Sequence, residues 1–321
     1  MWGRRAILAV AAHPAVARAV TRHGVRAAAR FVAGEELEDA LRAVRELNAA
    51  GLKATVDYLG EAVTAPEAAR AAAGVYAAVL DRIAAERLDA NISLKPTQLG
   101  LALDPALCRS LVGGLVERAA AAGNFVRLDM EDSRYTQATL DLFRELRRAW
   151  ASVGVVLQAY LYRSADDLRS LHRFAAELAQ PVLNVRFCKG AYSEPPSVAY
   201  PRRREVDANL LRLVIMHLEA GHYAAVATHD ERLIEEVIAY LGRRGGAAAG
   251  RCEFQMLYGI RRDLQRALAV RGFPVRVYVP FGRDWYAYFV RRLAERPANV
   301  AFLVRSLLRE GRAGRGAPTR R

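Results

Sequence analysis

Three positively charged residues have the chemistry of a carboxylate-binding site. Lys95 ends an apolar run before Pro96, and Arg291 and Arg292 are adjacent near the carboxyl end of the chain. Each guanidinium group can form two parallel hydrogen bonds with a carboxylate, and a lysine adds a compact positive charge. We interpret them as a clamp for a small amino or carboxylic acid, although Lys95 alone is also typical of a solvated strand end or an amine nucleophile.

The segment around the arginine pair favours a site over a solvated surface. Tyr288 and Glu295 share one broad helical face with Arg291 and Arg292, through spacings of three and four residues. A tyrosine ring can cover a small ligand, and a carboxylate can hold a guanidinium group in one orientation. The four residues therefore belong to one predicted substrate pocket.

A second group of residues has the chemistry of phosphate binding. Arg186 and Lys189 lie near the end of an apolar run that is followed at once by Gly190. A glycine lets backbone amides approach a phosphate closely, and the lysine adds charge, so the run predicts a pyrophosphate site. Thr228 and His229 end the next such run and are candidates for contacts with the same ligand.

The acidic motif RLDMED raises the question of a metal site. It brings Asp129, Glu131 and Asp132 close together in the sequence, but no histidine or second set of carboxylates has a ligand spacing that fits. We therefore predict that no metal is bound there.

Short β-type runs alternate with longer helical segments along most of the chain. The predicted strands are 53–60, 90–96, 125–132, 154–162, 183–190, 223–230, 252–259 and 275–282. The predicted helices are a lead-in to about residue 33, one through 47, then 66–86, 105–122, 136–150, 165–178, 206–220, 231–241, 262–270 and 284–297, with a loop over 193–204. Such alternation implies parallel strands joined by right-handed crossovers.

Eight repeats of this unit favour a (β/α)8 TIM-type barrel with extra amino-terminal helices. The competing doubly wound open sheet is the weaker fit, because only Gly60 follows the first strand where a dinucleotide-binding sheet has several glycines. Polar residues fall at the predicted carboxyl ends of the strands, where barrels carry their chemistry: Asp57, Glu61, Lys95, Asp129, Gln158, Arg186, Lys189, Thr228, His229, Gln255, Tyr258 and Tyr278. We expect a lead-in over 1–50, a barrel over 51–309 and a basic flexible tail over 310–321.

Composition limits the functional classes that remain. Apolar residues make up 53% of the chain and charged residues 26%, which is the balance of a globular protein, and no apolar run approaches the roughly 20 residues that span a bilayer. The amino terminus resembles a secretory signal, but His13 and Pro14 interrupt its apolar stretch. The three distant cysteines at 108, 188 and 252 match neither a disulfide framework nor a zinc site, so we predict a cytoplasmic protein.

The net charge of +14 invites a nucleic-acid-binding interpretation. The arginines, however, are scattered over most helical segments, and the only dense basic stretch is 309–321. This pattern is typical of a solvated surface, and we predict no nucleic-acid partner.

Seven motifs in order resemble a known family. SLKPTQLG, RLDMED, LQAYLYR, RFCKGAY, ATHD, YVPFG and YFVRRLAE are similar to those of the flavin-dependent proline dehydrogenases, in particular the bacterial single-function enzymes. The resemblance extends from about Tyr58 to Leu307. It implies oxidation of L-proline to Δ1-pyrroline-5-carboxylate by hydride transfer to N5 of FAD, the first step of proline catabolism.

The resemblance also assigns roles to individual residues. The implied proline contacts are Lys95, Asp129, Tyr192, Leu257, Tyr278, Tyr288, Arg291, Arg292 and Glu295. The implied FAD contacts are Asp129, Met130, Gln158, Arg186, Cys188, Lys189, Gly190, Ala191, Tyr192, Thr228 and His229. Tyr278 resembles the residue of enzymes that take proline rather than 4-hydroxyproline, and Cys188 departs from the family, which usually has an aliphatic residue there.

The family implies partners as well. Electrons are expected to pass to a membrane quinone, with peripheral association at the inner face of the cell membrane, and a pyrroline-5-carboxylate dehydrogenase is the expected functional partner. Two other functional classes are a Schiff-base aldolase that uses Lys95 or Lys189 and a nucleic-acid binder that uses the basic tail. Neither accounts for the seven motifs.

Overall fold

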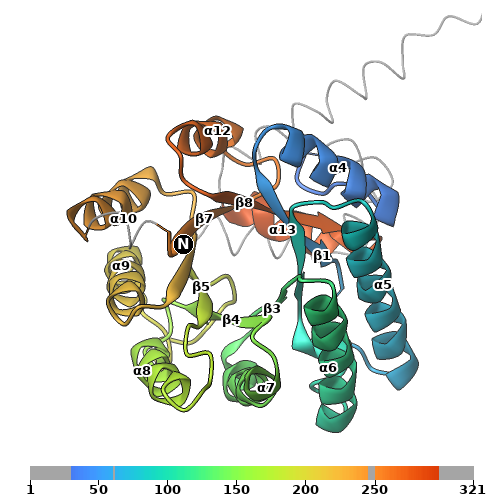
Figure 1. Ribbon diagram of the computed structural model, residues 1–321. Helices are drawn as coiled ribbons and strands as arrows, with labels where there is room; N and C mark the ends of the chain where they lie inside the picture. Colours follow the sequence, from blue (N-terminus) through green and yellow to red (C-terminus); the bar gives the residue numbers. More distant parts are fainter. Residues whose placement is uncertain (1–29, 61, 245–249, 296–321) are drawn as a thin grey trace, which may run out of the picture.

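Eight parallel strands close into a barrel in sequence order, and the helices form an outer ring (Figure 1). The computed structural model describes residues 30–60, 62–244 and 250–295, with side chains as far as residue 290. The strands are β1 (Lys53–Tyr58), β2 (Ala90–Leu94), β3 (Val126–Leu128), β4 (Val153–Gln158), β5 (Asn184–Cys188), β6 (Tyr223–Ala227), β7 (Cys252–Leu257) and β8 (Val275–Phe281). The predicted (β/α)8 barrel is thereby confirmed.

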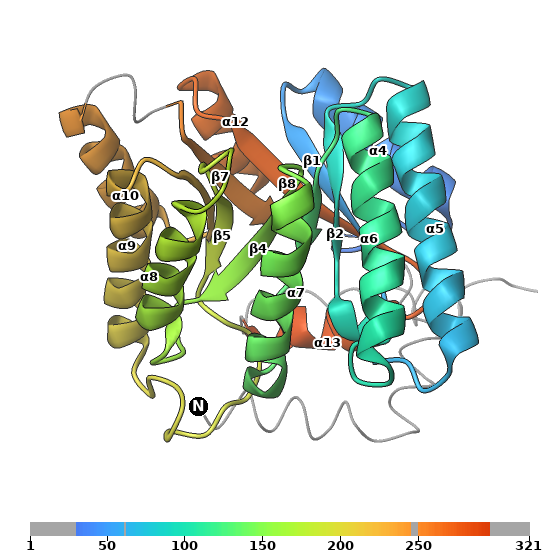
Figure 2. The same cartoon turned by 60° about the horizontal axis from the view of Figure 1, so that its bottom comes forward.

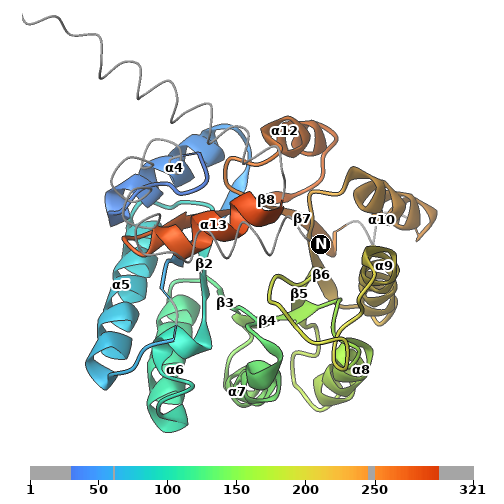
Figure 3. The same ribbon diagram turned by 180° about the vertical axis from the view of Figure 1, so that it is seen from behind.

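The helices between the strands stand around the barrel wall (Figure 2). They are α4 (Leu37–Ala49), α5 (Pro66–Ala85), α6 (Pro105–Ala121), α7 (Thr136–Ala149), α8 (Ser164–Ala175), α9 (Arg203–Glu219), α10 (Glu231–Arg244) and α12 (Arg262–Val270). Short 3-10 turns, η1 (Pro96–Leu99) and η2 (Ser133–Tyr135), follow β2 and β3. The last described helix, α13 (Trp285–Glu295), instead crosses the end of the barrel at which the strands finish (Figure 3).

Local sequence explains where these elements begin. Pro66 and Pro105 occupy the first turn of α5 and α6, where a missing backbone N–H costs no hydrogen bond. The Asp104 side chain caps α6 by accepting a hydrogen bond from the Ala106 amide at 2.9 Å. All six residues of β4 are buried, because a parallel barrel strand is covered by helices on one face and by the barrel interior on the other.

Two predicted boundaries need correction. β3 is shorter than the predicted strand 125–132, because the Asp129 amide bonds to the Leu94 carbonyl at 2.8 Å and Asp132 then caps η2. α9 begins at Arg203, inside the predicted loop 193–204, since the Glu205 carboxylate accepts a hydrogen bond from the Arg202 amide at 3.2 Å and starts the helix there. Both corrections lie at the carboxyl ends of strands.

The residues just before α4 hold α13 in place. The Ala33 amide donates to the Pro280 carbonyl at 2.9 Å, and the Gly282 amide donates to the Gly34 carbonyl at 3.0 Å. Seven buried apolar residues around α13 form what we call the α13 cluster: Phe31, Val32, Leu59, Ile260, Trp285, Tyr288 and Phe289. Residues 1–29 of the predicted lead-in and the predicted tail lie outside the described residues.

Candidate active site

Polar side chains from several strands around the barrel meet in its interior, near the carboxyl ends of the strands. Five of them are buried and Tyr278 is partly buried. They come from β1, β2, the turn after β3, β5, β7 and β8: Asp57, Ser93, Asp129, Arg186, Gln255 and Tyr278. Because β2, β5 and β8 do not pair with one another, hydrogen bonds among these residues cross the interior.

The centre of this group is an ion pair between Arg186 and Asp129. Arg186 Nη1 lies 2.6 Å from Asp129 Oδ1 and donates to Ser93 Oγ at 3.0 Å. Arg186 Nε donates to Gln255 Oε1 at 2.5 Å, and its guanidinium carbon lies 5.5 Å from the centre of the Tyr278 ring. Contacts on two edges fix the plane of the guanidinium group.

Asp129 is bound on both of its oxygens. Ser93 Oγ donates to Oδ1 at 2.6 Å, and the Tyr278 hydroxyl donates to Oδ2 at 2.7 Å. Burial raises the pKa of Tyr278 well above its usual value, so the phenol keeps the proton that it donates. The structure therefore brings together Arg186, which the sequence assigned to the cofactor, Tyr278, which it assigned to the substrate pocket, and Asp129, which it assigned to both.

Lys95 is held by a carboxylate that the sequence placed at the strand ends but to which it gave no role. Its Nζ lies 3.0 and 3.1 Å from the two oxygens of Asp57, which is fully buried and also accepts a hydrogen bond from the Tyr76 hydroxyl at 3.2 Å. Burial has the largest single effect and would lower the pKa of Lys95, but Asp57, Asp129 and Glu131 together outweigh burial and raise that pKa. Lys95 is thus a charged ammonium group, which disfavours the Schiff-base interpretation because that chemistry needs a neutral amine.

The turn that follows Lys95 is fixed by a second carboxylate, that of Glu131. It accepts hydrogen bonds from the Thr97 amide at 2.9 Å and from the Thr97 hydroxyl at 2.5 Å. The two residues lie on different strand ends, so the bonds tie the turn after β2 to the turn after β3. One sequence signal could have indicated these two roles. Asp57 and Glu131 each lie at the carboxyl end of a predicted strand, where a buried carboxylate usually has a partner.

The end of β5 turns sharply at Gly190. This residue has φ +108°, and a Cβ atom there would lie 2.3 Å from the Tyr160 ring. The Tyr160 amide donates to the Lys189 carbonyl at 2.9 Å, which holds the turn against the end of β4. The positive φ and the Tyr160 ring packed against this residue thus require glycine at position 190.

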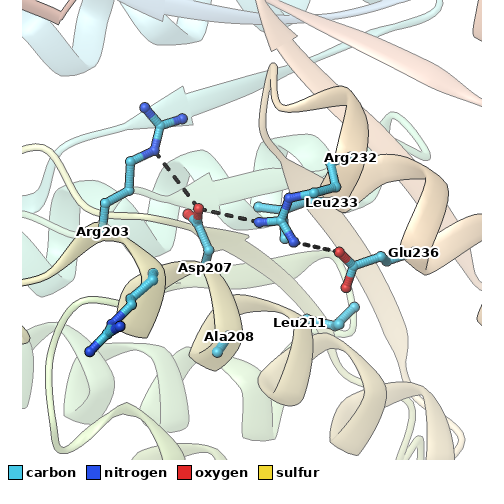
Figure 4. Close-up of a pocket in the computed structure, with 8 residues that line it drawn as sticks. Arg203, Asp207, Ala208, Leu211, Arg232, Leu233 and Glu236 are labelled. Atoms are coloured by element: carbon cyan, nitrogen blue, oxygen red, sulfur yellow. Dashed lines mark hydrogen bonds and ion pairs between the residues drawn. The ribbon is translucent and has the colours of Figure 1, made fainter.

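The charge of Lys189 is shared with two carboxylates. Its Nζ lies 2.6 Å from Asp207 and 3.0 Å from Asp230. Arg203 and Arg232 pair with the same carboxylates from the surface, at 3.3 Å and 3.6 Å. Of these residues, Arg203, Asp207 and Arg232 line part of an open pocket of about 500 Å³ between α9 and α10 (Figure 4). The charged lining consists of Arg203, Arg204 and Arg232 against Asp207 and Glu236, so the pocket has an excess of positive charge.

The remaining predicted cofactor residues lie around the strand ends between β3 and β7. Gln158 Nε2 donates to the Met130 carbonyl at 3.4 Å, and Thr228 Oγ1 accepts from the Asp230 amide at 3.1 Å. His229 Nε2 accepts from the Leu257 amide at 3.0 Å. Burial raises the pKa of Cys188 to about 11, so the residue is a thiol rather than a thiolate.

The other predicted residues divide into two groups. Ala191 and Tyr192 follow Gly190 in the segment after β5, and Leu257 and Tyr288 lie at the α13 cluster. Arg291, Arg292 and Glu295 belong to the last two turns of α13, across the carboxyl end of the barrel (Figure 3), but their side chains lie outside the described residues. In the described part of the chain, no group of three metal-binding side chains is close enough to hold an ion.

Comparisons with known proteins agree on one family. A family model described as proline dehydrogenase matches residues 40–305. Among curated proteins, a proline dehydrogenase of Deinococcus radiodurans is 42% identical over 311 residues, covering 95% of this chain and 98% of that protein. Proline dehydrogenase 1 of Bacillus subtilis is 40% identical over 293 residues, covering 90% and 92%.

A solved structure gives the same picture for the fold. Proline utilization A from Bdellovibrio bacteriovorus, inactivated by N-propargylglycine, superposes with a TM-score of 0.79 and 26% identity over 86% of this chain. The chain spans 33% of the length of that much larger protein.

Proposed function

The chain belongs to the proline dehydrogenase family, and on that premise we propose that it oxidises L-proline to Δ1-pyrroline-5-carboxylate with FAD as its cofactor. The family membership itself makes it an oxidoreductase of proline catabolism. The observation that carries the proposal is that Asp129, Arg186 and Tyr278, which come from three separate motifs, form one buried network.

The residues around the strand ends fit a flavin. The Oε1 atom of Gln158 is buried and has no hydrogen-bond partner within the described residues, so it suits an N–H group of a ligand. Arg186 uses Nε and Nη1 for contacts inside the described protein, which leaves Nη2 for a bound group. We propose that these two residues hold the isoalloxazine ring, together with Asp129, Met130, Cys188, Ala191 and Tyr192. Lys189, Gly190, Thr228 and His229 would hold the phosphates and adenosine.

When bound, FAD would supply the hydride acceptor at its N5 atom and would later pass the electrons to a quinone. The protein's own contribution is binding and electrostatics. We propose that Lys95, Arg291 and Arg292 bind the proline carboxylate, and that Asp129, Tyr192, Leu257, Tyr278, Tyr288 and Glu295 complete the pocket. A cationic pocket lowers the pKa of the proline ammonium group, and loss of that proton precedes formation of the C=N bond.

The partners follow from the chemistry of the product and the electrons. We propose a membrane quinone as the acceptor, peripheral association of a cytoplasmic protein with the membrane, and a pyrroline-5-carboxylate dehydrogenase as consumer of the product. Within the described residues, no helix is long and apolar enough to cross a bilayer. We also propose the division into a lead-in (1–50), a barrel (51–309) and a tail (310–321).

An anaerobic absorption titration tests the proposal. The purified protein, reconstituted with FAD where necessary, is expected to show flavin bands that bleach when L-proline is added. Much weaker bleaching is expected with 4-hydroxyproline, because the Tyr278 hydroxyl occupies the space of the extra group. A protein that cannot take up FAD, or whose flavin proline does not reduce, would refute the proposed function.

A pair of variants tests the carboxylate clamp. Arg291→Met is expected to weaken proline binding by about tenfold or more, the size of a lost hydrogen bond to a charged group. Arg283→Met is the matched control, since Arg283 precedes the same helix but pairs with Glu36 at the surface. Equal proline affinities in the two variants would remove Arg291 from the clamp.

A further inference from the structure

We propose that Gln255, with its amide oriented by Glu253, is a positioning residue that aims the Arg186 guanidinium group at the flavin. This inference rests on the proposed function, because it presumes a flavin beside Arg186. The three residues are buried in the barrel interior, with exposed fractions of 6% or less. Gln255 and Glu253 lie on β7, two residues apart on the same face of the strand, and Arg186 lies on β5.

The contacts form a continuous chain along the barrel axis. Gln255 Oε1 accepts a hydrogen bond from Arg186 Nε at 2.5 Å, and Gln255 Nε2 donates to Glu253 Oε1 at 2.5 Å. Arg276 Nε lies 3.0 Å from the same Glu253 oxygen, and its Nη1 donates to the Ala54 carbonyl at 2.8 Å. Arg186 is thus supported from below by a chain that ends on the backbone of β1.

The orientation of the Gln255 amide is what Glu253 determines. An amide can present either its C=O or its NH2 group to a neighbour, and only the C=O group can accept a bond from Arg186 Nε. An ionised carboxylate only accepts hydrogen bonds, so it binds the NH2 end and forces the C=O end toward Arg186. A neutral partner that can also donate would permit the opposite orientation, in which two donors face each other.

Glu253 keeps the negative charge that this role requires. Burial has the largest single effect and would raise its pKa, but the ion pair with Arg276, together with Gln255 and Arg127, outweighs burial and lowers the pKa. The Tyr223 hydroxyl donates to the other oxygen, Oε2, at 3.2 Å. The carboxylate therefore stays ionised although it is 3% exposed.

The consequence is a fixed direction for Arg186. With Nε bound to Gln255, and Nη1 bound to Ser93 and Asp129, the guanidinium group cannot rotate without breaking contacts on two edges. The Nη2 group of Arg186 is then held in a single direction relative to the barrel. A cation held in place beside a flavin stabilises the negative charge gained on reduction, and a cation free to turn away stabilises it less.

The first test replaces the amide without changing charge. In Gln255→Met the midpoint reduction potential of the bound flavin, measured anaerobically against a reference dye, is expected to fall. The reduction equilibrium should change by about tenfold, which is about 30 mV for a two-electron couple. Gln255→Leu repeats the test with different packing, and far-UV circular dichroism verifies that each variant is folded.

Gln265→Met is the matched control. Gln265 is equally buried and donates to the Leu257 and Ile260 carbonyls, but it does not contact Arg186. This variant should lose stability while the flavin potential stays at the wild-type value. Equal potentials in wild type and in Gln255→Met, or equal shifts in Gln255→Met and Gln265→Met, would overturn the role of Gln255.

A double-mutant cycle tests Glu253. Removing a buried negative charge by Glu253→Gln would itself raise the flavin potential, and this charge effect is the same whether or not Gln255 is present. We therefore compare the shift in flavin potential that Glu253→Gln causes in wild type with the shift that it causes in Gln255→Met. If Glu253 acts by orienting Gln255, the shift in wild type should be more negative than the shift in Gln255→Met. Identical shifts in the two backgrounds would exclude the orienting role.

The two proposals fail in distinguishable ways. A wild-type protein whose flavin is not reduced by proline contradicts the proposed function. A wild-type protein that proline does reduce, and whose potential is unaffected by Gln255→Met, contradicts only the positioning role.

Discussion

At the scale of single residues, the pair formed by Asp57 and Lys95 explains how one ammonium group can be both charged and buried. In the proposed clamp Lys95 must stay charged to attract a carboxylate, yet its side chain is only 11% exposed. Asp57 supplies the opposite charge that makes burial tolerable, and its two oxygens lie 3.0 and 3.1 Å from the ammonium nitrogen. Orientation and charge therefore both come from a residue that need not touch the substrate.

Removal of Asp57 should destabilise the protein strongly. Asp57→Ala leaves the Lys95 ammonium group buried without compensation, and we expect the free energy of unfolding to fall by about 3–5 kcal/mol. The double variant Asp57→Ala/Lys95→Met should recover part of this loss. Urea unfolding at pH 7 measures both.

The surface pair of Lys53 and Asp89 provides the control for that measurement. Their charged atoms lie 2.9 Å apart, but both side chains are more than one third exposed. Asp89→Ala should therefore cost less than about 1 kcal/mol. A similar loss for Asp57→Ala would mean that the buried pair contributes no more than a solvated one.

At the same scale, the sequence predicted the types of site residue better than their contacts. The family resemblance placed Arg186 in the cofactor subsite, Tyr278 in the substrate subsite and Asp129 in both, and the structure brings the three side chains together. Glu253 was not singled out, because an acidic residue near the start of a strand is usually a solvated charge. Only the three-dimensional register shows that it faces inward beneath Gln255.

At the scale of elements, α13 depends on a segment far away in the chain. Phe31 lies against Phe289, with ring centres 6.1 Å apart, and the Trp285 indole donates to the Glu35 carboxylate at 3.2 Å. The backbone bonds of Ala33 and Gly34 add to this attachment. The helix that carries the predicted arginine pair is therefore held from the amino-terminal side of the barrel domain.

Loosening this attachment should affect substrate binding more than turnover. Phe31→Ala removes a ring that is 2% exposed from the α13 cluster, and we expect the KM for proline to rise by about tenfold with a smaller change in kcat. Steady-state kinetics with a quinone analogue measure both constants.

Phe143→Ala is the appropriate comparison, because Phe143 is a fully buried residue of α7 and does not belong to the α13 cluster. It should reduce the melting temperature and leave the KM near the wild-type value. An equal rise of KM in both variants would mean that α13 responds to general destabilisation rather than to its own support.

The elements themselves were predictable because each carries a local signal. The eight apolar runs and the proline-led helices depend on short-range periodicity, and the structure has a strand at each of the eight runs. The end of β3 was predicted wrongly because a backbone bond from the Asp129 amide to Leu94, on the neighbouring strand, ends the run. The start of α9 was predicted wrongly because the Glu205 carboxylate binds the Arg202 amide and begins the helix inside a run that is rich in proline and arginine.

At the scale of the whole molecule, the two ends of the barrel have different chemistry. The end opposite the site holds three clustered imidazoles: His172 on α8, His217 on α9 and His222 just before β6. His172 Nε2 lies 3.0 Å from His217 Nδ1, and the ring centres of the three residues lie 4.7 to 5.2 Å apart. Arg251 adds a further positive charge beside His222.

Acid should destabilise the fold through this cluster. Burial lowers the pKa of all three imidazoles, that of His172 to about 4. An unfolded chain binds protons at its histidines near pH 6.5, so between pH 6.5 and about 4 the unfolded state holds more protons and stability falls as the pH falls. Above about pH 7 the contribution is complete and flat.

Thermal unfolding across pH 4 to 8 measures this dependence. Each imidazole contributes a slope of at most about 1.4 kcal/mol per pH unit in that window. In His172→Gln the stability should depend less steeply on pH, because the contribution of one imidazole to the slope is lost. A curve that keeps its wild-type slope in this variant would assign the acid sensitivity to other groups.

The surface charge of the whole molecule is consistent with the solvated face that the scattered arginines indicated. Arg118 pairs with Asp81 across α6 and α5, and Arg271 pairs with Glu235 across α12 and α10. Water and salt screen such exposed pairs, so they add little to stability. The scatter of charged residues in the sequence indicated that such surface pairs would occur. The buried ion pairs could not be predicted in this way, because the sequence does not show which charged residues are buried.

The chain of contacts from Arg276 through Glu253 and Gln255 to Arg186 has a consequence for engineering. Barrel enzymes are commonly regarded as a neutral scaffold whose loops can be exchanged to change activity. Here the residues that would touch a ligand are supported by others a full layer deeper, on strands rather than loops. A chimera that received only the loops of this protein would acquire its contact residues without their alignment, so a working transplant must include the lower halves of β7 and β8.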